Sequence, residues 1–343
     1  MGWQWRNPRR SVRRRLPSLP GRSILAAGLL ALLGAWLLGY GQLGIGHSDP
    51  ELLAERYVDE RSRFVRISGA RVHVREEGVP RGVPVLLLHG VNGSLHVWEP
   101  WVDRLRQRYR VISVDLPPWG LSGPLPGAGY DGPEMTRLLG ALLDELAIGP
   151  AIVIGHSLGG YYAAYLAAHE PARVQALVLV APAGYPQAAP PWLHLAALPV
   201  VGEVSQWILP RPLVRLAMSS LYAQPQRLDE ASVQRQYDLM RAPDNRGHAR
   251  DVLRMLLAYR DRQPHWVSRI EQPTLLLWGE QDGWIPIEQA GRWLDDLNSA
   301  RLVRYPDAGH VPMEELAERS AADLLEFLAL LNERTPGLAT AHR

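Results

Sequence analysis

The sequence contains no cysteine in its 343 residues, which excludes disulfide bonds and metal sites built on thiolates. It also contains no lysine, so every basic residue other than histidine is an arginine. Residues 1–48 carry seven arginines and no acidic residue, whereas the whole chain has 37 Lys plus Arg against 35 Asp plus Glu. The formal net charge of +2 therefore comes from the N-terminal tail, and the body of the chain gives no reason to expect nucleic-acid binding.

Residues 23–48 contain neither arginine nor an acidic residue, and they directly follow the arginine-rich residues 1–22. A helix over residues 23–46 would be about 36 Å long, enough to cross a hydrocarbon core of about 30 Å. Because the arginines favour the cytoplasmic side, the pattern predicts a single-pass signal anchor in the inner membrane, with the rest of the chain on the extracytoplasmic side. A cleaved signal peptide followed by secretion is the alternative.

Over residues 62–184, which follow an expected linker at 47–61, short apolar runs alternate with helical patterns. The runs expected to form strands are 64–67, 72–75, 84–88, 111–114, 151–154 and 176–180. The alternation predicts an α/β fold with a mostly parallel, doubly wound sheet and helices on both faces. Ligands in such sheets bind at the carboxyl ends of the strands, so the residues after each run are candidates for a site.

Residues 185–263 show no convincing strand pattern and instead contain strongly apolar helical stretches interrupted by proline. We interpret this segment as a helical cap inserted over the strand ends, where it would enclose a hydrophobic pocket. A helical subdomain that only packs on the core is the alternative. The sheet is expected to resume in a second core segment, residues 264–333, with strands at 274–278 and 302–305. Residues 334–343 are expected to form a flexible tail.

The apolar run 151–154 leads directly into the sequence Gly155-His156-Ser157-Leu158-Gly159, which has the form Gly-x-Ser-x-Gly. A serine on such a sharp strand-to-helix turn has its hydroxyl exposed, and the two glycines let the strand and the helix approach closely. The helix is expected to begin near Leu158, and its free N–H groups would point at any ligand of the serine. The motif alone is common, so the assignment of Ser157 as a nucleophile depends on its partners.

A serine hydroxyl needs an imidazole base, and that imidazole needs a carboxylate that fixes its tautomer. Asp282 and His310 each follow a predicted strand and lie in a glycine-containing turn, in the chain order Ser, Asp, His that this type of sheet favours. We therefore predict a catalytic triad of Ser157, His310 and Asp282. The oxyanion formed on attack needs preorganised donors, and the backbone N–H groups of Val91 and Leu158 are the candidates.

The remaining site predictions concern the pocket and cofactors. The candidate pocket residues are Asn92, Trp119, Trp192 and Val311. His169-Glu170 is followed by Arg173 at the position where a zinc-binding helix motif requires a histidine. No metal ion and no organic cofactor are therefore expected.

With these residues in place, the sequence resembles the α/β-hydrolase superfamily over residues 64–332, including the cap. The stretches that carry the resemblance are His89-Gly90 with Gly93-Ser94 and Trp98, Asp115-Leu116-Pro117 with Gly120-Leu121-Ser122, Gly155-His156-Ser157-Leu158-Gly159-Gly160, Ala183-Gly184-Tyr185-Pro186 and Gly309-His310-Val311-Pro312-Met313-Glu314. Together they are similar to membrane-anchored or secreted bacterial lipases and esterases. The resemblance implies hydrolysis of carboxylic esters by a Ser157–His310–Asp282 triad.

Several positions depart from other members of this superfamily. Ser157 stands where epoxide hydrolases and haloalkane dehalogenases have an aspartate nucleophile, and Val91 replaces the halide-binding asparagine of the dehalogenases. Val311 replaces the tryptophan that often follows the histidine in hydrolases of carbon–carbon bonds. Pro118-Trp119 replaces a more usual pair of glycine with an aromatic residue or histidine, so the loop after Asp115 is expected to shape the pocket differently.

We therefore expect a serine hydrolase that acts on small lipophilic esters or acyl compounds and is attached to a membrane by its N-terminal helix. A serine-dependent hydrolase of carbon–carbon bonds, or a cofactor-free perhydrolase, is the alternative on the same scaffold. A membrane-tethered binding module without catalytic activity is a third hypothesis from a different class. The acyl-chain length and the oligomeric state stay open.

Overall fold

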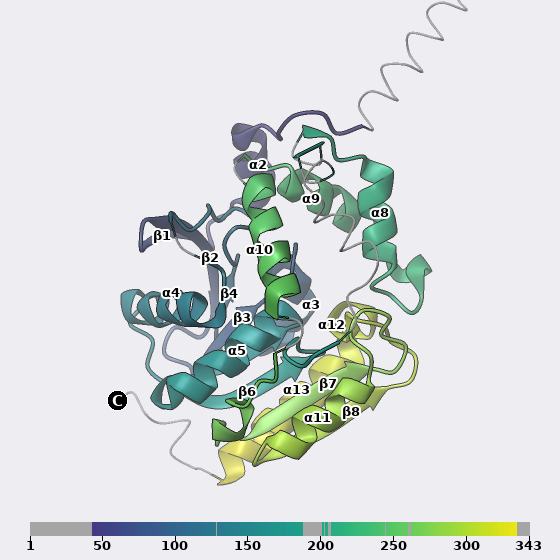
Figure 1. Ribbon diagram of the computed structural model, residues 1–343. Coiled ribbons are helices and arrows are strands. Elements are labelled where there is room, and N and C mark those ends of the chain that lie inside the picture. Colours follow the sequence, from purple (N-terminus) through teal and green to yellow (C-terminus); the bar gives the residue numbers. More distant parts are fainter. Residues whose placement is uncertain are drawn as a thin grey trace, which may run out of the picture. The chain divides into compact units, whose positions relative to one another are not determined.

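The computed structural model describes residues 43–127, 129–187, 201, 203–204, 207–243, 245–259 and 262–334. Their central element is an eight-stranded sheet with the order β1-β2-β4-β3-β5-β6-β7-β8 (Figure 1). The strands are β1 (Ser62–Ile67), β2 (Ala70–Gly78), β3 (Pro84–Leu88), β4 (Arg110–Val114), β5 (Ala151–His156), β6 (Val174–Val180), β7 (Thr274–Gly279) and β8 (Ala300–Tyr305). Strand β2 is antiparallel to β1 and β4, and the other neighbouring strands are parallel. The mostly parallel α/β sheet expected from the sequence is confirmed.

Helices cover both faces of this sheet (Figure 1). The described α-helices are α2 (Pro50–Tyr57), α3 (Glu99–Leu105), α4 (Gly132–Glu145), α5 (Leu158–His169), α8 (Arg211–Ser219), α9 (Glu230–Met240), α10 (Asn245–Tyr259), α11 (Glu288–Asp296), α12 (Pro312–Glu315) and α13 (Ala317–Arg334). In β3, Leu86 and Leu88 pack into the core with α4 and α5, whereas Val85 and Leu87 pack into the core with α3 and α13. Because β3 is buried on both faces, its sequence is an unbroken apolar run.

Local sequence signals set the ends of several elements. Ser68 and Gly69 have φ angles of 50° and 83°, as a two-residue turn between paired antiparallel strands requires, and they connect β1 to β2. Helix α4 begins at its observed position because the Asp131 side chain accepts the Glu134 N–H and Pro133 occupies the first turn. These two signals could be read from the sequence because the residues that form them are neighbours in the chain.

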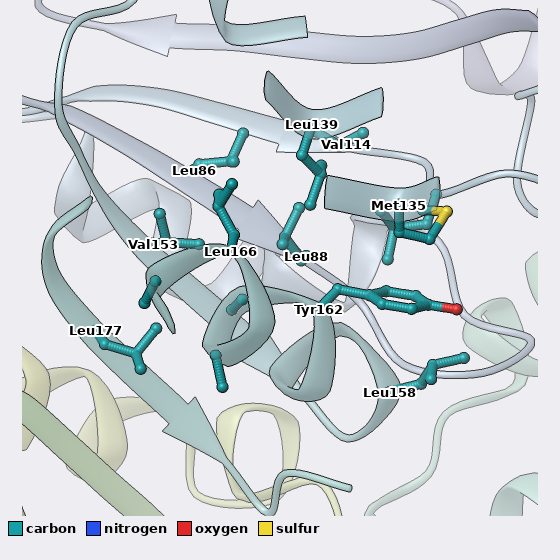
Figure 2. Close-up of a cluster of buried hydrophobic side chains, with 14 of the residues drawn as sticks. Leu86, Leu88, Val114, Met135, Leu139, Val153, Leu158, Tyr162, Leu166 and Leu177 are labelled. Atoms are coloured by element: carbon teal, nitrogen blue, oxygen red, sulfur yellow. The ribbon is translucent and has the colours of Figure 1, made fainter. Parts of the chain in front are cut away.

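Helix α5 connects the core to the end of the sheet where the candidate site lies. Leu158, Tyr162 and Leu166 recur every four residues, so they share one face of the helix. Figure 2 shows them in one cluster with strand residues that include Leu88 and Val153. None of the three helix residues is more than 2% exposed, and burial of each large apolar side chain contributes about 1.5–3 kcal/mol to stability. This packing fixes the helix whose first residue follows Ser157.

The segment between β6 and β7 contains helices α8, α9 and α10 (Figure 1). No strand of the sheet comes from this segment among the residues that the structure describes, apart from an isolated bridge at Ile208. The expected helical stretch at 191–198 lies outside the described residues. Tyr161 on α5 and Leu256 on α10 line the same cavity, so the helical segment does lie over α5.

The transmembrane helix expected over residues 23–46 is not supported. Residues 23–42 lie outside the described residues, as do the basic tail and the last nine residues of the chain. No helix in the described part of the chain is long and apolar enough to cross a membrane. The expected end of the span is not helical, because Ile45 pairs with Ile208 in an isolated antiparallel bridge. The extracytoplasmic location, which depended on this helix, stays a prediction.

Candidate functional site

Ser157 lies in the turn between β5 and α5, with a φ of 52° and a ψ of −117°. A non-glycine residue in such a conformation is strained by on the order of 1–3 kcal/mol and keeps it only where its surroundings enforce it. Here the Ser157 N–H donates to the Val180 carbonyl at 2.9 Å, and the Ser157 carbonyl accepts the N–H groups of Tyr161 and Ala183. Bonds to two neighbouring elements therefore hold the turn that carries the serine.

His310 and Asp282 form a buried hydrogen-bonded pair, with His310 Nδ1 2.7 Å from Asp282 Oδ2. The other carboxylate oxygen, Oδ1, accepts the backbone N–H groups of Trp284 and Ile285 at 2.8 and 2.9 Å. Because an ionised carboxylate only accepts hydrogen bonds, the proton of the imidazole stays on Nδ1. In the neutral ring, Nε2 is then free to accept a proton.

The main chain of His310 is held from two directions. Its N–H donates to the Leu221 carbonyl at 2.7 Å, and its carbonyl accepts the Nε2–H of His156 at 2.9 Å. The ring centroids of His156 and His310 are 4.6 Å apart. Burial, together with the neighbouring His310, holds the pKa of His156 well below its usual range, so His156 stays neutral beside the base. The residue before Ser157 is thereby linked to His310.

The structure places the three predicted triad residues after β5, β7 and β8, whose carboxyl ends lie at one edge of the sheet. In the described part of the chain, His310 forms hydrogen bonds with Asp282, Leu221 and His156, and none reaches the Ser157 hydroxyl. A hydrogen bond between a nucleophile and its base is often long in the absence of substrate. The Asp282–His310 half of the arrangement is thus formed in this structure.

His89 fixes the peptide group that contains the Val91 N–H. Its Nε2 accepts the Leu116 N–H at 2.8 Å, so its Nδ1 carries the proton and donates to the Gly90 carbonyl at 2.7 Å. In the planar trans peptide between residues 90 and 91, the N–H points opposite to that carbonyl. A Cβ on Gly90 would lie 3.0 Å from the Ser157 Cβ, so this peptide lies beside the serine. Burial lowers the pKa of His89, which keeps the ring neutral and this tautomer in place.

A cavity of about 390 Å³ lies between α5 and the helical segment that precedes β7. Ser157, Val91 and Leu158 line it, so the candidate nucleophile and the two residues whose N–H groups are the candidate oxyanion donors border one space. Leu158 is the first residue of α5, and the first N–H groups of a helix have no partner inside it. Other lining residues are mainly apolar or aromatic and include Tyr161, Tyr165, Tyr185, Met255, Leu256 and Trp284. The cavity has the size of a site for a small molecule.

Three of the four residues predicted to line the pocket, Asn92, Trp119 and Val311, do not line this cavity. Trp119 is buried in a core cluster, with its ring edge-on to His89, and Val311 is buried in the core on the other side of the sheet. Asn92 does not line the cavity, and its carbonyl accepts a hydrogen bond from the side chain of Gln236. Trp192 lies outside the described residues. Proximity in sequence to a site residue did not determine the direction of these side chains.

Five aromatic residues of the cavity wall were not predicted from the sequence: Tyr161, Tyr165, Tyr185, Trp266 and Trp284. Tyr161 and Tyr165 follow Ser157 at intervals of four residues, a spacing that places them on one face of α5 and could have identified them. Trp284 comes two residues after Asp282, and its ring stacks on His310 with 5.9 Å between centroids and 14° between planes. The spacing predicts the two tyrosines, but nothing in the sequence predicts the stacking of Trp284.

A second serine–histidine–aspartate chain occurs away from the cavity. Ser62 Oγ lies 3.0 Å from His73 Nε2, and His73 Nδ1 lies 2.7 Å from Asp115 Oδ2. Although burial alone would raise it, the hydrogen bond from His73 lowers the pKa of Asp115 to about 2. Ser62 belongs to the regular strand β1, and none of the three residues lines the cavity, so we assign this chain to structure. No group of three or more potential ligands among the described residues is arranged to hold a metal ion.

Residues 83–316 match the family model described as alpha/beta hydrolase fold. The chain belongs to the α/β-hydrolase fold family. The matched range begins just before β3 and includes every element that carries a candidate site residue.

Relatives of this α/β hydrolase are named for different substrates. The chain is 29% identical over 270 residues to the 2-hydroxy-6-oxononadienedioate/2-hydroxy-6-oxononatrienedioate hydrolase of Burkholderia vietnamiensis. The alignment covers 75% of this chain and 91% of the relative. It is 28% identical over 257 residues to the poly(3-hydroxyalkanoate) depolymerase of Ectopseudomonas oleovorans, with 75% and 88% covered. The crystal structure of a membrane phospholipase A, a bacterial virulence factor, matches with a TM-score of 0.70 and 24% identity over 91% of this chain and 99% of that chain. This last likeness shows a shared fold.

Proposed function

We propose that this α/β hydrolase cleaves esters of lipophilic carboxylic acids through an acyl-enzyme on Ser157. The observation that carries the proposal is the cavity. The strained serine and the two residues with the candidate oxyanion N–H groups line it, and the other described residues of its wall are mostly apolar. A neutral acyl group fits such walls because its burial leaves no charge unpaired.

In the proposed reaction, Ser157 Oγ attacks the ester carbonyl while His310 Nε2 takes the hydroxyl proton. Asp282 stabilises the imidazolium, and the N–H groups of Val91 and Leu158 donate to the oxyanion. The tetrahedral intermediate then expels the alkoxide, which receives the proton from His310 and leaves as an alcohol. His310 then takes a proton from the water that attacks the acyl-serine. It returns this proton to Oγ as the carbonyl–Oγ bond breaks, which releases the acid and restores Ser157.

The charge of the cavity wall favours an ester over a dicarboxylate. The relative from Burkholderia vietnamiensis is named for a dienedioate, a substrate with two carboxylates. Arg262 is the only charged side chain among the described residues that line the cavity in this chain. Two carboxylates in a mostly apolar site with one cationic neighbour would lose more by desolvation than they gain by pairing. A singly charged or neutral substrate avoids this cost.

Hydrolysis of a carbon–carbon bond is the second candidate, because a relative is named as a hydrolase of 2-hydroxy-6-oxononadienedioate, a substrate whose name contains no ester. Perhydrolysis and binding without catalysis are the further alternatives. A panel of p-nitrophenyl esters of graded acyl length, assayed beside dienol diketones, separates these functions. We expect ester cleavage that improves as the acyl chain lengthens beyond acetyl. Turnover of dienol diketones without esterase activity would favour the second candidate, and labelling of Ser157 by a fluorophosphonate would exclude an inactive binding module.

A further inference from the structure

The helical segment contacts the acid and base loops of the candidate site through a cap strip, which we define as residues 220–224. The His310 N–H donates to the Leu221 carbonyl at 2.7 Å. Trp284, whose ring stacks on His310, donates its Nε1–H to the Ser220 hydroxyl at 3.0 Å. The loops after β7 and β8 are therefore both bonded to the same five residues of the helical segment.

Glu315 fastens the cap strip to the loop that carries His310. Its Oε1 accepts the Gln224 N–H at 2.7 Å, and its Oε2 accepts the N–H groups of Ala223 and Gly309 at 3.1 and 2.7 Å. The residue is 6% exposed. Because each of the three donors would be left unpaired if the carboxylate moved, this arrangement strongly opposes displacement.

The cap strip lies so close to Gly309 that a side chain at this position would clash with it. A Cβ at position 309 would lie 2.5 Å from the Leu221 carbonyl oxygen and 2.7 Å from the Ala223 nitrogen. Just beyond the strip, Arg227 donates to the carbonyl of Glu315 at 2.9 Å. The residue before His310 therefore cannot shift unless the cap strip shifts with it.

We propose that Glu315 is a positioning residue: it holds the cap strip against Gly309 and thereby fixes the main chain from which the His310 imidazole extends. The proposal rests on the proposed function for the role of His310 as base. Glu315 does not line the cavity, so it acts through His310 and not on the substrate. A misplacement of about 1 Å at a reacting group can lower a rate on the order of 100-fold. The base is thus held jointly by the sheet and the helical segment.

Replacement Glu315→Gln keeps the shape of the side chain but removes the charge that accepts three N–H groups. We expect kcat for a short p-nitrophenyl ester to fall by about 10- to 100-fold, with little change in KM. The rate at which a fluorophosphonate labels Ser157 should fall by the same factor, because labelling also needs His310. Glu318→Gln is the matched control, since Glu318 is exposed on α13 and pairs only at the surface with Arg104. Thermal unfolding of both variants verifies that they are folded at the assay temperature.

Two further measurements separate positioning from general loss of stability. In Glu315→Ala, formate should restore part of kcat because it can accept from the three N–H groups, whereas formamide should not. The low-field proton NMR signal of His310 Nδ1–H reports the position of the imidazole without turnover, and it should move in Glu315→Gln and stay in Glu318→Gln. An unchanged kcat, labelling rate and proton signal in folded Glu315→Gln would overturn the proposal, as would a rise in KM alone. If the wild type is not labelled but the proton signal still moves, the proposed function fails and the positioning role stands.

Discussion

At the residue scale, the candidate base is oriented by groups that other hydrogen bonds hold in place. Asp282 Oδ1 accepts two backbone N–H groups, which leaves Oδ2 for His310. His89 and His156 each donate from one ring nitrogen to a main-chain carbonyl, which sets their tautomers. Because two backbone N–H groups fix the Asp282 carboxylate, a change of one atom at position 282 should move the His310 proton from Nδ1 to Nε2.

Replacement Asp282→Asn should lower kcat for the proposed ester cleavage by about 10³- to 10⁴-fold, by analogy with the loss of the triad carboxylate in serine hydrolases. The asparagine oxygen must face the N–H groups of Trp284 and Ile285, so its NH₂ faces His310. Nδ1 then accepts, Nε2 carries the proton, and the ring cannot take a proton from the serine. Steady-state kinetics checks this result. Asp307→Asn, a surface partner of Arg319, is the control and should keep wild-type kcat.

At the element scale, the end of β3 and the start of α5 must nearly touch for the site to form. A Cβ at Gly159 would lie 2.3 Å from the carbonyl oxygens of both Leu88 and His89. Both carbonyl oxygens belong to the main chain, which cannot change its conformation to avoid the clash as a flexible side chain can. Because Gly159 has no side chain, the turn that contains Ser157 can lie close to the peptide that contains the Val91 N–H.

Replacement Gly159→Ala should destabilise the protein by about 2 kcal/mol or more and remove most of the activity, since α5 must move away from β3. Gly291→Ala on α11 is a matched control, because a Cβ there meets nothing within 4 Å. In that helix, alanine should stabilise the protein by up to about 1 kcal/mol. Urea unfolding measures the stability of Gly159→Ala and Gly291→Ala, and ester assays measure their activity. Similar stabilities for the two alanine variants would contradict the close approach of β3 and α5.

The elements that the sequence predicts are those that depend on neighbouring residues. Unbroken apolar runs predicted the buried strands, and Gly-x-Ser-x-Gly predicted the turn at Ser157, because local pattern and local backbone geometry are coupled there. The cavity wall depends on how α5 and α10 pack, which no local pattern contains. The burial of Trp119 and Val311 in the core likewise depends on contacts between segments distant in the sequence. The contact of Glu315 with the cap strip joins residues that are 91 and 92 positions apart.

At the scale of the whole molecule, buried titratable groups couple stability to pH. Burial lowers the pKa of His96 to about 3 and also lowers those of His89 and His156. An unfolded histidine binds a proton near pH 6.5, so below that pH unfolding takes up protons and stability is lost as the pH falls. Glu314 acts in the opposite direction, because burial raises its pKa to about 7 and the folded state holds a proton that the unfolded state releases. The three histidines outweigh this one glutamate.

Between pH 6 and pH 5, the free energy of unfolding should therefore decrease as the pH is lowered. His96→Gln removes one proton taken up on unfolding, so the slope should become smaller by about 1.4 kcal/mol per pH unit. Glu314→Gln removes one proton released on unfolding, so the slope should become larger by a similar amount. Urea unfolding at several pH values in this range measures the three slopes. Equal slopes for the wild type and both variants would show that these groups titrate alike in the folded and unfolded states.

The most direct test of the central claim is to trap the acyl-enzyme. A p-nitrophenyl ester mixed with the protein, quenched in acid during the first turnovers and digested, should give one peptide whose mass is increased by the acyl group, with the modification on Ser157. Ser62→Ala, which breaks the second serine–histidine–aspartate chain, should give the same adduct, and Ser157→Ala should give none and lose ester cleavage. Cleavage by Ser157→Ala at the wild-type rate, or an acyl group found on another residue, would contradict the account.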